Sequence, residues 1–187
     1  HPSLLKKKNR NDPIWLDKVP KRVMPGEKRR DDSIYHFLLP DKSMADYGDK
    51  VIKKLAKTEI KKIDIWRSDF TKPFSTAEIE LLKGFSKSVD RLWELHARQQ
   101  TSIVEHSKDP LHVFGQKKIQ KNSQPILTGE KDQYLKDQIL PVNVMNSSPF
   151  QRLKLIMDYW CSLWYWPIEK AESLPSRSEY ILEMTML

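Results

Sequence analysis

The sequence predicts a mainly α-helical protein preceded by an extended basic arm. Apolar residues recur at steps of three and four in 60–70 and again in 76–106, which is the spacing of helices with one buried face. A third stretch, 149–166, is apolar around nearly its whole circumference, as in a helix buried on most sides. Residues 1–32 show neither helical nor strand periodicity. These patterns predict an arm, 1–32, followed by one helical domain, 33–187.

The arm carries most of the basic character of the chain. The net charge of the 187 residues is +8, and residues 1–30 hold ten lysines and arginines against three acids. Residues 130–187, by comparison, hold six basic and eight acidic side chains. Prolines interrupt the arm repeatedly, so we expect it to be extended, either lying on a neighbour or disordered.

The first part of the helical domain is short and irregular. Ser33 to Leu39 is an apolar run ended by a proline, and its length suits either one strand or one helical turn. A short helical segment follows with Val51, Ile52 and Leu55 on one face, and Thr58 is the candidate cap of the next helix. That helix is expected to bury Ile60, Ile63, Trp66 and Phe70, and to end at Lys72-Pro73.

The longest helix is predicted at 76–106. Ser75 and Glu78 form a capping box, and Phe74 and Ile79 are spaced as the matching hydrophobic staple. At 1.5 Å per residue this helix is on the order of 45 Å long, so we expect it to be a spine on which the others pack.

The second half of the domain is predicted to hold three more helices. A polar connector at about 115–129 leads to a helix at 130–140 with Tyr134, Leu135 and Ile139 inward. The aromatic-rich helix 149–166 then forms the centre of the core. A capping box at Ser176 and Glu179 starts the last helix, with Tyr180, Ile181, Met184 and Leu187 on one face.

The basic arm is the candidate functional site. Clustered lysines and arginines neutralise phosphates whatever the base sequence, and Trp15 among them can stack on a base. The alternative is a solvated segment that covers a neighbouring domain. The predicted nucleic-acid-binding residues are Lys6, Lys7, Lys8, Arg10, Lys21, Arg22, Lys28, Arg29 and Arg30.

No catalytic, cofactor-binding or metal-binding residues are assigned. The histidines show no ligand spacing with one another or with Cys161, which is expected to be a buried, inert cysteine. The five glycines are isolated, so no phosphate-cradling loop is present. A lone cysteine and the absence of a signal peptide predict a cytoplasmic protein, and both ends are expected to lie inside a longer chain.

Three stretches of the chain resemble one family. They are residues 4–20 (LLKKKNRNDPIWLDKVP), 35–42 (YHFLLPDK) and 152–167 (RLKLIMDYWCSLWYWP). Together they are similar to a region of very large bacterial N6-adenine DNA methyltransferases of restriction and phage-defence systems. The resemblance implies a helical linker, spacer or recognition region near the catalytic core of such an enzyme.

The motifs for chemistry in that family do not occur here. Its methyltransferase domain binds S-adenosylmethionine through a Gly-rich loop and selects adenine with an Asn-Pro-Pro-Tyr type motif. The nearest text in this chain, Ser148-Pro149-Phe150, has one proline where the motif has two. The resemblance therefore implies S-adenosylmethionine only in the rest of the parent protein, with DNA and the parent's other domains as partners of this region.

Two other functions remain open from the sequence. In one, the arm and a helical face dock on another domain, and the chain is a protein-interaction scaffold that touches no nucleic acid. In the other, the chain is an enzyme in its own right, which requires a pocket of converging polar side chains with perturbed pKa values. The sequence offers no such set of residues.

Overall fold

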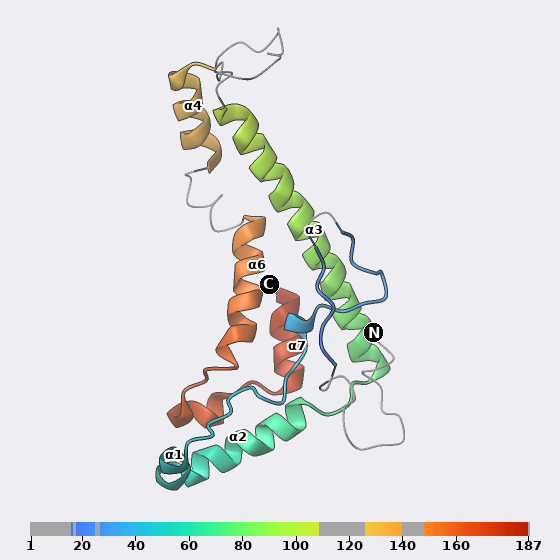
Figure 1. Cartoon of the computed structure of the whole chain (residues 1–187), viewed down its shortest axis with the longest axis vertical. Helices are drawn as coiled ribbons and strands as arrows, with labels where there is room; N and C mark the ends of the chain where they lie inside the picture. The colour runs from blue at the N-terminus through green and yellow to red at the C-terminus, as the bar shows by residue number, and fades with distance from the viewer. Residues whose placement is uncertain (1–15, 17, 25–26, 109–125, 140–147, 187) are drawn as a thin grey trace. The chain divides into compact units, whose positions relative to one another are not determined.

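The chain is mainly α-helical, as predicted (Figure 1). It divides into two compact units. The computed structural model describes residue 16 and residues 18–24, 27–108, 126–139 and 148–186, and these contain no strand. The first unit comprises residues 1–90 and 154–187, and the second comprises residues 91–153. Helices α3 (Thr76–Ser107) and α6 (Pro149–Ser162) contribute residues to both units.

Helix α2 (Lys57–Phe70) and the short helix η5 (Ile168–Ser173) pack together in the first unit. The core between them holds Ala45, Ile63 and Ala171, each less than a tenth exposed. Five half-buried residues pack against these three: Tyr47, Trp66, Trp166, Ile168 and Leu174. Burial of these apolar side chains holds the two elements together.

Helix α7 (Arg177–Met186) is fixed to the start of α3 and to α2. Arg177 Nε lies 2.9 Å from Glu78 Oε1, and its guanidinium stands over the ring of Phe74. The ring of Tyr180 meets Phe70 edge-on, with 5.4 Å between centroids. The predicted burial of Tyr180, Ile181 and Met184 is confirmed.

The predicted helix at 76–106 and both capping boxes are confirmed. Helix α3 begins after Ser75, whose backbone N–H donates to Glu78 Oε2 at 2.7 Å while its hydroxyl accepts from the Glu78 N–H at 3.2 Å. Ser176 and Glu179 make the same pair of bonds before α7, at 2.7 and 3.3 Å. Each box satisfies donors that a helix start leaves unpaired, so these boundaries are set locally.

The first part of the domain differs from the prediction in one boundary. The stretch 33–39, for which the sequence left a strand or a helical turn open, contains a single turn of 3-10 helix, η3 (His36–Leu38). Helix α1 (Lys50–Leu55) is capped by Asp49 and leaves Val51 and Leu55 exposed. Thr58 is no cap, because only Ala56 separates α1 from α2.

The aromatic-rich helix is shorter and more exposed than predicted. Helix α6 ends at Ser162, and the chain turns before η5. Leu153, Ile156 and Leu163 are buried, but the exposed large side chains of this stretch include Phe150, Leu155, Met157 and Tyr165. The prediction of burial on most sides is therefore wrong, because neighbours cover only one face of the stretch.

The second unit contains helix α4 (Thr128–Tyr134), which continues into a π-helical turn, η4 (Leu135–Ile139). Tyr134 stacks on His106 of α3, with ring centroids 4.3 Å apart, and its hydroxyl lies 3.0 Å from Ser102 Oγ. Leu135, predicted to point inward, is 41% exposed. Most of the predicted connector lies outside the described residues, and its last two residues begin α4 instead.

Candidate nucleic-acid interface

The described part of the arm is joined to α3 by one arginine. Arg29 donates from Nη2 to Asp90 Oδ2 at 2.7 Å and from Nε to the same oxygen at 3.1 Å. Its remaining nitrogen donates to the carbonyls of Arg30 and Ser33. The Arg29 side chain is only 4% exposed. A two-pronged arginine–carboxylate pair of this kind fixes both position and orientation.

Tyr35 continues this anchor into the next segment. Its hydroxyl donates to Asp90 Oδ1 at 2.7 Å, and its backbone N–H donates to the buried Ser86 hydroxyl at 3.3 Å. Burial, followed by the hydrogen bond to Asp90 and its charge, raises the pKa of Tyr35 to about 12. The phenol therefore remains a neutral donor at physiological pH.

Trp160 of α6 is held from three sides. Its indole N–H donates to the carbonyl of Leu39 at 2.8 Å. The rings of His36 and Trp164 each meet it at steep angles, with centroids 5.8 and 5.3 Å away. The indole of Trp160 is therefore held both by a hydrogen bond and by ring packing. We call Trp160, Trp164 and His36 together the aromatic wall.

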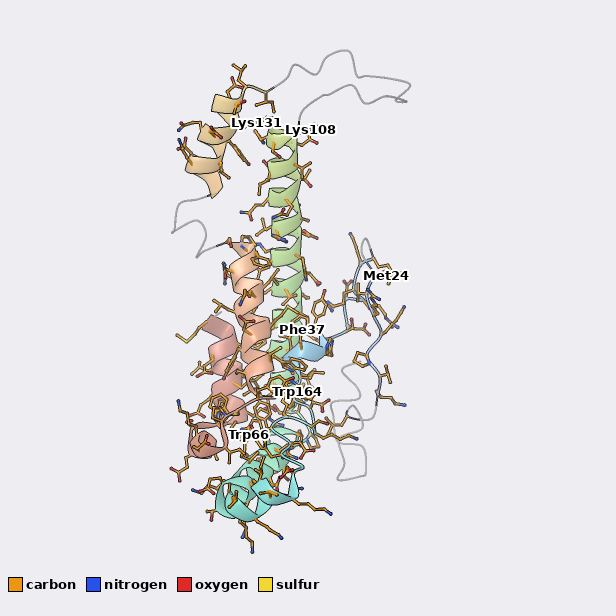
Figure 2. All side chains as sticks on the ribbon, turned by 60° about the vertical axis from the view of Figure 1, so that its left-hand side comes forward. Met24, Phe37, Trp66, Lys108, Lys131 and Trp164 are labelled. Carbon is orange, nitrogen blue, oxygen red and sulfur yellow. The ribbon has the colours of Figure 1, made fainter. Side chains whose placement is uncertain are left out.

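The arm and the aromatic wall enclose a groove of about 640 Å³, which we call the basic groove. Figure 2 shows the segment around Met24 as irregular chain outside the helices, and it also labels Trp164, which lies in the turn after α6. The acidic side chains that line the groove are Glu27 and Asp41. Its basic lining residues are Lys18, Lys21, Arg22, Lys28, Arg29 and Arg30, and its aromatic ones are Tyr35, His36, Trp160 and Trp164.

The charge of the basic groove is largely uncompensated. Lys18, Lys21, Arg22 and Lys28 are exposed and form no ion pair within the described ranges. Arg30 lies 3.6 Å from Asp32, but its side chain is 77% exposed. The two lining carboxylates already accept backbone N–H groups, Glu27 from Met24 and Asp41 from Ser43. The groove therefore has a net positive charge that suits an anionic ligand.

The predicted binding residues fall into three groups. Lys6, Lys7, Lys8 and Arg10, together with Trp15, lie outside the described residues. The structure brings four of the others together along the basic groove: Lys21, Arg22, Lys28 and Arg30. Arg29 also lines the groove, but its charge is already paired with Asp90.

Sequence reasoning missed one basic and four aromatic residues of the groove: Lys18, Tyr35, His36, Trp160 and Trp164. Lys18 was not among the predicted contacts, although its charge was visible in the arm. Tyr35 and His36 lie more than a hundred residues from Trp160 and Trp164 in the sequence, and the aromatic helix was expected to be core. Only the folded structure places these rings beside the arm, so no local signal could have identified them.

Trp164 differs from the other tryptophans of the first unit in its hydrogen bonding. Trp66, Trp160 and Trp166 donate to the backbone carbonyls of Pro175, Leu39 and Lys170, at 2.7, 2.8 and 2.9 Å. Trp164 Nε1 is buried and has no acceptor within the described ranges. A buried donor left unpaired costs about 1–3 kcal/mol. The indole of Trp164 is thus not locked by a polar contact.

Cys161 is exposed, which overturns the prediction of a buried cysteine. It occupies a position on α6 that no element of the described ranges covers, although Trp160 beside it is half-buried. No group of three or more His, Cys, Asp or Glu side chains within the described ranges could hold a metal ion. No helix in those ranges is long and apolar enough to cross a membrane.

No protein-family model, curated protein or solved structure matches this chain. The basis for a function is therefore the chemistry of the basic groove itself. Its cations suit phosphate groups, and its aromatic wall suits planar groups.

Proposed function

We propose that the chain is a non-catalytic helical region of a bacterial DNA-modifying enzyme, and that the basic groove helps to position DNA. The parent enzyme is proposed to be a cytoplasmic N6-adenine methyltransferase of a restriction or phage-defence system, on the sequence resemblance. Its S-adenosylmethionine site and catalytic residues would then lie in other parts of the parent chain.

One observation carries the DNA-binding proposal: Lys18, Lys21, Arg22 and Lys28 line the groove without a described ion-pair partner. A lysine or arginine that contacts phosphate releases condensed counterions, which favours binding independently of base sequence. Such contacts fix the register and orientation of a protein on DNA. The anchor at Arg29 supports the same role, because it joins the segment that carries Lys28 and Arg30 to α3.

The test is a fluorescence-anisotropy titration of the chain with labelled duplex DNA at low and at physiological salt. Non-specific binding of this kind has dissociation constants of about 10⁻⁴ to 10⁻⁶ M at physiological salt. The variant K21Q/R22Q/K28Q removes three groove cations, and K6A/K7A/K8A/R10A removes the cluster nearer the N-terminus. Both should bind more weakly than the unmodified chain.

A matched control is available on helix α1. The variant K50Q/K53Q/K54Q also removes three exposed positive charges, but these residues do not line the groove. It should retain most of the affinity. Absence of binding at low salt, or equal loss in the groove and control variants, would contradict the proposal.

A second candidate function is the docking of a neighbouring domain. A hollow of about 460 Å³ between α6 and α7 is lined by Leu155, Tyr159 and Met186, with Asp158 and Glu183 among its walls. Leu155 and Met186 are 49% and 80% exposed. Exposed apolar surface with a polar rim is typical of interaction sites.

Amide hydrogen exchange distinguishes this second function. If a domain of the parent protein covers the hollow, residues 155–159 should exchange more slowly in the full-length protein than in this chain alone. Equal exchange rates in the two proteins would exclude docking at this surface.

A further inference from the structure

The basic groove combines two features that a duplex-binding surface does not require. Phosphate contacts need only the cations, which lie on the arm. The groove also has an aromatic wall, formed by Trp160, Trp164 and His36. Bases inside a double helix are stacked on one another, so their faces are not available to such a wall.

The size of the basic groove agrees with a small planar ligand. Its volume of about 640 Å³ falls within the range of about 300–1,000 Å³ that is usual for sites that enclose small molecules. A base with its sugar and phosphate is a ligand of this class. A double helix can only lie across the mouth of such a space.

The side chain of Trp164 is the one that a base would contact. Its ring packs against Trp160 at an interplanar angle of 60°, while Trp160 itself is fixed by Leu39. The indole nitrogen of Trp164 has no acceptor in the described part of the chain. Trp164 is half-buried and lines the groove, so the exposed part of its side chain is open to a ligand bound there.

We infer that the basic groove takes an unpaired nucleotide of DNA, with the base stacked on Trp164 and the phosphate bound by Lys21 and Arg22. This inference rests on the proposed DNA-binding function, and it adds the form of DNA that the groove prefers. Stacking of a base on an aromatic side chain tolerates every base, because each base has a π face. The preference is therefore for single strands and not for a particular sequence.

The first test changes the ligand and leaves the protein intact. The unmodified chain is titrated with a single-stranded oligonucleotide, with the duplex of the same length, and with a single strand of abasic sugar-phosphate units. The single strand should bind about tenfold or more tightly than the abasic strand, because stacking is lost in the latter. Equal affinity for these two strands would overturn the inference, since phosphate contacts would then account for all binding.

The second test changes Trp164. The variant W164A should lose the preference for the single strand over the abasic strand, whereas W164F should keep most of it because phenylalanine still stacks. Trp93 is 49% exposed on α3 and does not line the groove, so W93A is the matched control and should behave as the unmodified chain. A W164A variant that keeps the full preference would also overturn the inference.

Failure of this inference can be separated from failure of the proposed function. If every strand binds equally and K21Q/R22Q weakens all of them, the groove binds phosphate and only the stacking inference fails. If no nucleic acid binds at low salt, both fail. The ratio of affinities for normal and abasic strands decides between stacking and a structural role of Trp164, because a loss of folded protein lowers both affinities together.

Discussion

The guanidinium of Arg29 binds the carboxylate of Asp90, which lies 61 residues later in the sequence, with Nη2 2.7 Å from Oδ2. Tyr35 donates to the other oxygen of the same carboxylate. Asp90 is thus the point at which the arm and the segment before η3 both meet α3. Removing a charge from this cluster leaves its partner partly buried without compensation.

Replacement of Arg29 by alanine should therefore lower the free energy of unfolding by about 1–3 kcal/mol. The lower part of that range is expected because the Asp90 side chain is 36% exposed and water can partly replace the lost partner. Urea denaturation monitored by circular dichroism measures the effect. The neighbouring variant R30A is the control, since the Arg30 side chain is 77% exposed and should cost less than about 0.5 kcal/mol.

The capping box before α3 gives a second stability prediction. The Ser75 hydroxyl accepts the backbone N–H of Glu78, so S75A should destabilise the chain by about 1 kcal/mol. Ser88 lies exposed within the same helix, and S88A should be neutral or slightly stabilising because alanine favours the helical state. A midpoint of urea unfolding that is equal in the two variants would show that the box contributes nothing.

The second capping box predicts a dependence of stability on pH. The backbone hydrogen bond from Ser176 lowers the pKa of Glu179 below its usual 4.5. Because the folded-state value is the lower one, the stabilisation is present above pH 4.5 and is lost as the pH falls through the lowered pKa.

The variant E179Q isolates this contribution, since glutamine can still accept the bond but carries no charge. Its unfolding free energy should lie below that of the unmodified chain at about pH 7, and the two should converge toward about pH 3. Urea titrations at a series of pH values provide the comparison. A constant difference down to the lowest pH would mean that the charge of Glu179 is not involved.

The exposure of Cys161 predicts that its thiol reacts readily in the folded protein. Its rate with a colorimetric thiol reagent should be similar in buffer and in denaturing urea. A reaction that proceeds only after unfolding would instead agree with the buried cysteine that the sequence suggested.

The helix boundaries could be predicted where the sequence determines them locally. Capping boxes and proline breaks act over three or four residues, and so the start of α3, the end of α2 and the start of α7 were correct. Burial depends on what packs against a helix. Phe150, Leu155 and Tyr165 looked like core residues, yet they are exposed because no described element covers them.

The candidate site was predictable only in part, for a similar reason. The cations at Lys21, Arg22, Lys28 and Arg30 were identified from composition, which needs no fold. The sequence could not predict that Arg29 forms an ion pair with Asp90, because side chains 61 residues apart meet only through the tertiary structure. The sequence also could not predict that Trp164 lines the same groove as the arm, because the two lie far apart along the chain.

The salt dependence of duplex binding tests most directly the claim that the cations of the basic groove contact DNA phosphates, because it measures the number of such contacts. For duplex DNA, the slope of log K against log salt concentration is about −0.9 per phosphate neutralised. If the groove cations contact phosphates, the variant K21Q/R22Q/K28Q should have a shallower slope, by up to about 0.9 for each of the three cations removed. The control variant K50Q/K53Q/K54Q should leave the slope unchanged. A slope that is the same for the unmodified chain and the groove variant would contradict the account.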